Sequence, residues 1–255
     1  MLRLKQQGLG KGEPLLIIHG WGMNSSVWKA VAKDLERHFQ VTWLDLPGHG
    51  NNSDIQAENL LAIVDKILPV IKKPTHIIGW SLGGLIAQEI LKQSPELIKK
   101  IVLVASTPRF SQSQDWKNAM STEVLQAFSD NLQKDIKGTI KRFIALQFID
   151  VKGSQTIQRE LREKLLSDLP AESALMTGLD ILQYQDLRHE PIKHDNLWIL
   201  GERDRLVPVE VKQDLATLFS NANIKVISGA GHAPFMTHPK EFVAIVIDFL
   251  TAKIR

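Results

Sequence analysis

The sequence predicts an α/β fold, in which a mostly parallel sheet is flanked by helices and carries an inserted helical cap. Short apolar runs at 15–18, 41–44, 75–78 and 101–104 alternate with helical patterns over 26–38, 57–73 and 84–94. The apolar runs are continuous, which is typical of parallel strands buried on both faces. From Pro108 to about His189 no good strand pattern occurs, and apolar residues recur at helical spacing instead.

The strand pattern resumes at 197–200 and 225–227, with helical patterns over 208–219 and 239–252. A chain of 255 residues is long enough for one large α/β domain with an insertion. We therefore expect residues 1–107 and 190–255 to form one core and residues 108–189 to be inserted into it as a helical cap.

The composition sets limits on the class of protein. Hydrophobic residues make up 44% and charged residues 23%, which are ordinary values for a globular protein. The apolar runs are shorter than the roughly 20 residues of a spanning helix, and the first fourteen residues show no signal-like apolar core. We therefore expect a cytoplasmic protein that does not associate with a membrane, and we expect it to be a monomer. Cysteine is absent, which excludes disulfides, thiolate catalysis and cysteine-ligated metals.

The charge is distributed unevenly along the chain. The net charge is only +3, and no Lys/Arg-rich run is interleaved with aromatic residues, so we expect no nucleic-acid partner. Between Lys134 and Lys164, however, eight cations stand against four anions, a net charge of +4. This segment is either a solvated helical face or a surface for an acidic partner.

The segment Gly79-Trp80-Ser81-Leu82-Gly83 follows an apolar run and precedes a helical pattern. A strand, a sharp turn and a helix with serine at the apex is the arrangement that exposes a serine nucleophile. Serine needs a base to remove its proton, and that base needs an acid to orient it.

In this arrangement the acid and the base follow the serine along the chain, each after a strand. Asp204 follows the apolar run that ends at Leu200, and His232 follows the Gly-rich turn after Ile227. We predict that Ser81, Asp204 and His232 form a catalytic triad. Glu202, Asp180 and Asp186 compete with Asp204 for the role of the acid.

The turn His19-Gly20-Trp21-Gly22 follows the first apolar run. We expect the backbone N–H groups of Trp21 and Leu82 to form an oxyanion hole, because fixed dipoles stabilise a developing negative charge without reorganisation. The alternatives are a simple tight turn and, for Trp21, packing in the core. The segment 45–50, which contains His49, is interpreted as structural.

These motifs, taken together, resemble the α/β-hydrolase superfamily over nearly the whole chain. Within it, Trp80, the segment 105–111 leading to Trp116, and the segments 142–147 and 232–235 resemble the methyl ester esterases that act on pimeloyl-acyl-carrier protein in biotin synthesis. The turn Asp150-Val151-Lys152-Gly153 is longer than the corresponding turn of that family, which leaves the register of the cations after it open.

The resemblance implies a serine carboxylesterase that needs no metal or organic cofactor and releases methanol from a carrier-bound methyl ester. It implies an acyl-carrier-protein partner that docks on cap cations, for which the candidates are Lys137, Lys141, Arg142, Arg159 and Arg162. The residues that it places around the substrate are Trp21, Ser81, Leu82, Phe143, Ile144, Ala145, Leu146, Gln147 and His232.

Other functions remain open at this point. A small-molecule carboxylesterase or a C–C bond hydrolase would use the same triad without a carrier, and a hydrolase-fold receptor would use the pocket for binding. A haloalkane dehalogenase is disfavoured because its chemistry needs a carboxylate where Ser81 stands. The length of the acyl chain and the bond cleaved, methyl ester or thioester, depend on how far the chain threads into the site.

Overall fold

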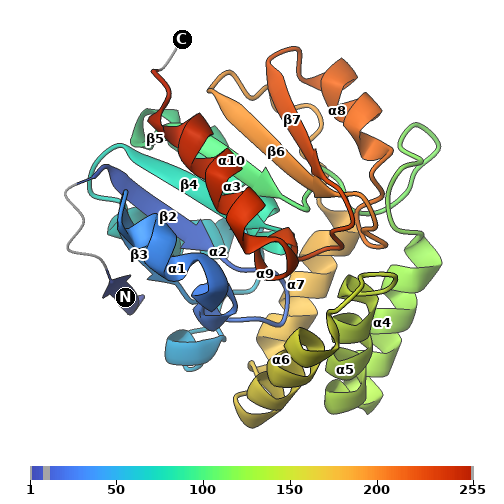
Figure 1. Cartoon of the computed structure of the whole chain (residues 1–255). Coiled ribbons are helices and arrows are strands. Elements are labelled where there is room, and N and C mark those ends of the chain that lie inside the picture. The colour runs from blue at the N-terminus through green and yellow to red at the C-terminus, as the bar shows by residue number, and fades with distance from the viewer. Residues whose placement is uncertain (1, 8–11, 254–255) are drawn as a thin grey trace.

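The computed structural model describes residues 2–7 and 12–253, whose strands form one seven-stranded sheet in the order β1-β3-β2-β4-β5-β6-β7 (Figure 1). β1 pairs antiparallel with β3, and every other pair of neighbouring strands is parallel. The strands are β1 (Leu4–Gln7), β2 (Pro14–Ile18), β3 (Gln40–Leu44), β4 (Thr75–Trp80), β5 (Ile98–Val104), β6 (Asn196–Gly201) and β7 (Ala222–Ile227).

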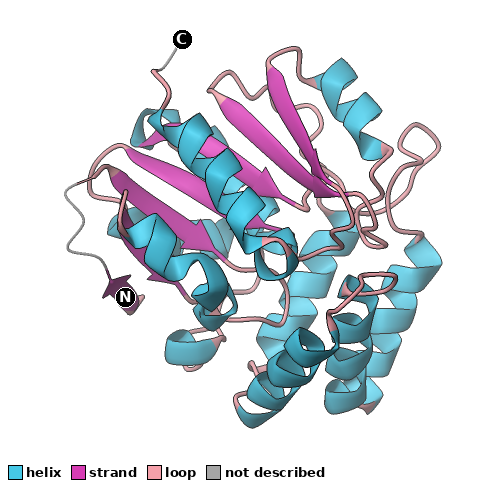
Figure 2. Ribbon diagram, viewed as in Figure 1, coloured by secondary structure: helices cyan, strands magenta, loops and turns pink. Residues whose placement is uncertain are grey.

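Helices cover both faces of this sheet (Figure 2). α1 (Lys29–Glu36) and α10 (Pro239–Thr251) pack together in front of the sheet in the view of Figure 1, and α2 (Leu60–Ile67) and α3 (Leu82–Gln93) pack together behind it. The remaining helices of this part are α8 (Val211–Leu218) and the short α9 (Pro234–Thr237). The prediction of an α/β fold with a parallel sheet between helices is confirmed.

β1 is the strand that the apolar pattern did not predict. It has the sequence Leu-Lys-Gln-Gln and lies at the edge of the sheet, paired only with β3. An edge strand does not need apolar side chains on both faces, so it leaves no continuous apolar run in the sequence.

Four helices follow one another between β5 and β6: α4 (Thr122–Lys134), α5 (Ile136–Gln147), α6 (Gln155–Ser167) and α7 (Glu172–Tyr184). We call them the cap. They gather beyond the carboxyl ends of the strands, below the sheet in Figure 1. Two of them are capped by side chains: Ser121 and Asp135 accept hydrogen bonds from backbone N–H groups in the first turns of α4 and α5. Within the described residues, no helix combines the length and the apolar character needed to span a membrane.

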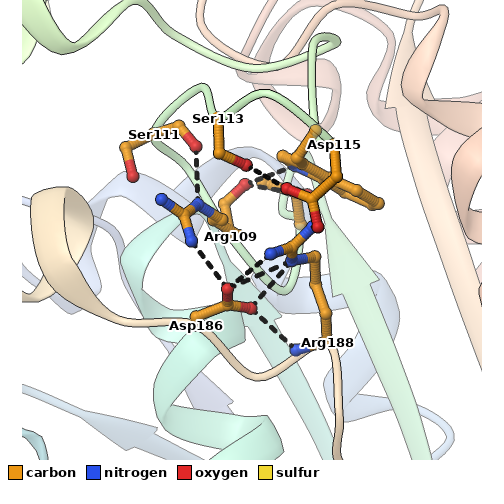
Figure 3. A network of polar contacts seen from close by, with 8 residues as sticks. Arg109, Ser111, Ser113, Asp115, Asp186 and Arg188 are labelled. Carbon is orange, nitrogen blue, oxygen red and sulfur yellow. Dashed lines mark hydrogen bonds and ion pairs between the residues drawn. The ribbon is translucent and has the colours of Figure 1, made fainter.

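The chain crosses between the sheet and the cap twice, and one polar network joins the two crossings (Figure 3). Leu187 N donates a hydrogen bond to Pro108 O at 2.9 Å. The Asp186 carboxylate accepts from Arg109 Nη1 at 2.7 Å and from Arg188 Nη2 at 2.8 Å. Arg188 also pairs with Asp115 at 3.0 Å. Burial alone would raise the pKa of Asp186, but the hydrogen bonds from Arg188 and Arg109 outweigh it and hold this pKa well below its usual range.

We expect Asp186→Asn to lower the free energy of unfolding by about 2 kcal/mol, because it leaves two arginines without their shared carboxylate. The depressed pKa means that the stabilisation is fully present at neutral pH and is lost only as the pH falls below about 3.9, the ordinary value for aspartate. Thermal unfolding at pH 7 and at lower pH measures both effects. Asp180→Asn on the exposed face of α7 is the matched control, and an equal loss in both variants would contradict the role of the network.

Candidate active site

Ser81 stands between the end of β4 and the start of α3, with φ of 54° and ψ of −119°. A positive φ is strained for a residue with a side chain and is found where a serine is held clear of a sheet. The flanking glycines make the turn possible. A Cβ atom at Gly79 would lie 2.3 Å from the carbonyl oxygen of Gly83, and one at Gly83 would lie 2.6 Å from that of His19.

The backbone of Ser81 is fixed from the neighbouring strand. Ser81 N donates to Val104 O at 2.9 Å, and Ser106 Oγ donates to Ser81 O at 2.9 Å. Gly84 gives the Ser106 side chain its room, since a Cβ atom there would lie 2.2 Å from Ser106 Oγ. The strained turn is therefore held by hydrogen bonds on both sides of the nucleophile candidate.

The structure brings Ser81, His232 and Asp204 together. Ser81 Oγ lies 2.9 Å from His232 Nε2, and His232 Nδ1 lies 2.8 Å from Asp204 Oδ2. All three residues are buried, with 3%, 0% and 5% of their surface exposed. Because a carboxylate only accepts, Nδ1 carries the proton and Nε2 is free to accept the serine hydroxyl. This is the arrangement in which histidine acts as a general base.

Asp204 is oriented by its own loop. Its Oδ1 accepts hydrogen bonds from Leu206 N at 2.8 Å and Val207 N at 3.0 Å, which leaves Oδ2 for His232. The other acids considered are engaged or turned elsewhere. Glu202 accepts from Gly229 N and Ser228 Oγ, Asp186 binds Arg109 and Arg188, and Asp180 is exposed on α7.

The loop that carries His232 is held by the core and by the cap. Trp80 Nε1 donates to His232 O at 2.7 Å, and His232 N donates to Gln147 O at 3.1 Å. A Cβ atom at Gly231 would lie 2.5 Å from the same Gln147 oxygen. The last turn of α5 is thus packed directly on the backbone of His232.

Two buried backbone donors lie beside the serine without an acceptor. Across residues 2–7 and 12–253, the N–H groups of Trp21 and Leu82 make no hydrogen bond, although both residues are only 1% exposed. Buried N–H groups are almost always paired in proteins, so an unpaired pair next to a nucleophile suits a developing oxyanion.

The loop that carries Trp21 is braced by His19. Leu46 N donates to His19 Nε2 at 3.0 Å, so Nδ1 carries the proton that is donated to Gly20 O at 2.8 Å. Burial lowers the pKa of His19 and keeps its ring neutral. The ring of His49 lies 5.1 Å from that of His19, and burial lowers the pKa of His49 to about 3. Both histidines support the loops and carry no charge.

The predicted substrate residues of α5 differ in how deeply they are buried. Phe143, Ile144 and Gln147 are buried, and Ala145 and Leu146 are half-buried. The Phe143 ring lies edge-on to Trp21 with centroids 4.8 Å apart. The side-chain Nε2 and Oε1 of Gln147 are buried and have no hydrogen-bond partner in the described part of the chain. An unpaired buried amide beside the base is free to bind a polar group of a substrate.

The predicted docking cations lie on two adjacent cap helices, Lys137, Lys141 and Arg142 on α5 and Arg159 and Arg162 on α6. Four are exposed, and Arg162 is half-buried. As far as the structure describes the chain, none of the five makes an ion pair with a carboxylate. Residues 2–7 and 12–253 also contain no group of three His, Cys, Asp or Glu side chains placed to hold a metal ion.

Sequence reasoning did not find the residues of α7 that contact Trp21. Trp21 Nε1 donates to Leu175 O at 2.8 Å, and a Cβ atom at Gly178 would lie 2.6 Å from Trp21 Cδ1. Both residues are in α7. The one signal in the sequence was a glycine in the interior of a helical pattern, which often marks a close contact.

A buried Ser–His–Asp arrangement at the carboxyl edge of an α/β sheet has the geometry of a serine hydrolase. Comparison with known proteins agrees with this class: the chain belongs to the alpha/beta hydrolase fold family, whose model matches residues 13–239.

Among curated relatives, the chain is 36% identical over 258 residues to the pimeloyl-[acyl-carrier protein] methyl ester esterase of Pseudoalteromonas atlantica, covering 99% of this chain and 98% of the relative. It is also 36% identical to the esterase of the same name from Vibrio campbellii, covering 96% and 98%. A solved esterase, EaEST from Exiguobacterium antarcticum, shares the fold with a TM-score of 0.88 at 19% identity, covering 98% of this chain and 96% of that one.

Proposed function

We propose that the protein is a serine esterase that hydrolyses the methyl ester of pimeloyl-acyl-carrier protein to pimeloyl-acyl-carrier protein and methanol in biotin synthesis. One observation carries the proposal: the 2.9 Å contact between Ser81 Oγ and His232 Nε2 lies in a chain that is 36% identical, over 99% of its length, to an esterase of that name. The contact supports the chemistry, and the similarity supports the substrate.

In the proposed reaction, Ser81 Oγ attacks the ester carbonyl carbon while His232 Nε2 takes the hydroxyl proton. Asp204 keeps the imidazole in the required tautomer and stabilises its positive charge. The N–H groups of Trp21 and Leu82 donate to the oxyanion. Collapse of the tetrahedral intermediate breaks the bond to methoxide, which leaves as methanol with the proton from His232.

Water then completes the reaction. It gives a proton to His232 and attacks the acyl-enzyme, and the second tetrahedral intermediate releases the free carboxyl group while Ser81 regains its proton. The mechanism uses only side chains and backbone groups of this chain, so we propose that no metal or organic cofactor takes part.

The substrate would be held by the cap. The buried residues Trp21, Phe143 and Ile144 provide an apolar wall for the acyl chain, and the unpaired amide of Gln147 provides a polar contact. Five cations of α5 and α6 that make no ion pair with a carboxylate within residues 2–7 and 12–253 would attract an acidic carrier protein and steer its tethered chain to the site: Lys137, Lys141, Arg142, Arg159 and Arg162.

The direct test is to incubate the purified protein with methyl-pimeloyl-acyl-carrier protein and follow the carrier by mass spectrometry. We expect loss of the methyl group with the acyl chain still attached. Release of the unacylated carrier would instead show thioester cleavage. Equal kcat/KM on the carrier-bound ester and on free methyl esters would favour a small-molecule esterase, and turnover that stops after one equivalent would favour a receptor.

A further inference from the structure

Trp21, which carries one of the two unpaired N–H groups, is held by the cap as well as by the core. Its indole Nε1 donates to Leu175 O of α7 at 2.8 Å, and its ring packs edge-on against Phe143 of α5 with centroids 4.8 Å apart. The residue is 1% exposed. The position of this indole is therefore set by two cap helices far from Trp21 in the chain.

Gly178 leaves the space that this contact needs. It lies three residues after Leu175, on the same face of α7, and a Cβ atom there would lie 2.6 Å from Trp21 Cδ1 and 3.2 Å from Leu82 Cδ2. The lack of a side chain at one position thus gives room to both residues whose N–H groups are unpaired. Glycine inside a helix costs about 1 kcal/mol relative to alanine, so this room is obtained at the expense of helix stability.

The loop that carries Trp21 is packed between the nucleophile and α7. A Cβ atom at Gly20 would lie 3.2 Å from both Ser81 Cβ and Trp80 Cε3, so the loop is packed closely on the nucleophile turn, and on the other side it is held to α7 by the Trp21 indole. Gly22 has φ of 68°. Because the loop is packed closely on the nucleophile turn, it has little freedom there to absorb a shift of the indole, and we expect such a shift to move the backbone N–H of Trp21.

We propose that Gly178 is a positioning residue. Because it has no side chain, the indole of Trp21 packs directly on α7, and this packing orients the backbone N–H of Trp21 toward the oxyanion. The oxyanion hole is then complete only while α7 packs against the loop that carries Trp21. The cap is therefore part of the catalytic apparatus. The inference rests on the serine esterase chemistry proposed above, but not on the identity of the carrier-bound substrate.

The test is Gly178→Ala, assayed on p-nitrophenyl acetate, whose acyl group is too short to depend on the acyl-chain wall. We expect kcat to fall about 10- to 100-fold with little change in KM, as for a displaced oxyanion donor. The midpoint of thermal unfolding should change little or fall slightly, because the cost of packing a methyl group against the buried Trp21 ring, about 1–3 kcal/mol, opposes the roughly 1 kcal/mol that alanine gains in the helix. Asp180→Ala, exposed on the same helix, should keep the wild-type kcat. A folded Gly178→Ala variant with the kcat of this control would overturn the proposal.

Trp21→Phe gives a second, independent variant, because it removes the indole N–H and shortens the ring that Gly178 faces. We expect a lower kcat for this variant, and adding Gly178→Ala to it should cause little further loss, since the two changes act on one contact. Losses that multiply in the double variant would overturn the proposal. A wild-type kcat in Trp21→Phe would overturn it as well, and that measurement does not depend on the folding of Gly178→Ala. A wild-type protein inert to both the acetate and a fluorophosphonate would instead contradict the proposed esterase function.

Discussion

Ser81→Ala is expected to lower kcat/KM for ester hydrolysis by about 10⁴- to 10⁶-fold while the protein stays folded. The side chain is small and buried, and the turn is held through the backbone of Ser81, so the loss of Oγ should not disturb β4 or α3. What remains is the catalysis supplied by the oxyanion donors and by binding. Hydrolysis of p-nitrophenyl esters, followed together with circular dichroism, measures both properties.

Variants of His232 and Asp204 should also have a lower kcat/KM for ester hydrolysis, but for different reasons. His232→Ala removes the base and should cost about as much as Ser81→Ala. Asp204→Asn should cost about 10⁴-fold, because its amide would present an N–H to His232 Nδ1 and favour the tautomer whose Nε2 cannot accept the serine proton. The double variant of Ser81 and His232 should be no slower than either single variant, since the two residues act as a unit.

Matched controls are available outside the site. Ser53→Ala and His38→Ala replace exposed residues of the same types and should keep the wild-type kcat/KM. Near-normal hydrolysis by a folded Ser81→Ala variant would rule out serine catalysis, and with it the proposed mechanism.

The turn around Ser81 was predictable because the contacts that require it are local. Two glycines placed two residues either side of Ser81 are needed by contacts within the turn and with the adjacent loop, and the strand and helix around it have their own apolar patterns. The positions of Asp204 and His232 were predictable for a related reason: Asp204 follows the buried strand β6 and His232 follows the edge strand β7, and the loops after parallel strands lie at one edge of the sheet.

The contact between the Trp21 indole and α7 was not predictable in the same way. Trp21 Nε1 and Leu175 O belong to residues 154 positions apart, and neither periodicity nor spacing relates a core loop to a cap helix. Apolar patterns show that α7 has a buried face but not what that face covers. Asp186 illustrates the same limit. Its place near the end of the cap made it a candidate acid, whereas its partners are Arg109 and Arg188 of the network in Figure 3.

Reversing Arg142, Arg159 and Arg162 to glutamate together is expected to lower kcat/KM on the carrier-bound methyl ester by about 100-fold and to spare a short soluble ester. Arg142 and Arg159 are exposed and Arg162 is half-buried, and in the part of the chain that the structure describes none of the three makes an ion pair with a carboxylate. Their charges therefore act on a partner more than on the fold. The wild-type rate on the carrier substrate should also fall as salt rises past roughly 0.15 M, where the Debye length is about 8 Å.

The control must change the net charge equally without touching the cap. Lys33, Lys212 and Lys240 are exposed on α1, α8 and α10, and their reversal to glutamate leaves both substrates unaffected if the effect is local to the cap. Surface charges act mainly on association. The triple variant of Arg142, Arg159 and Arg162 should therefore have a lower kcat/KM on the carrier substrate but the wild-type single-turnover rate at saturating carrier. If the triple variant hydrolyses both substrates more slowly by the same factor, these arginines support the structure of the cap. If neither substrate slows, the basic face is solvated surface, and the carrier-docking role is wrong.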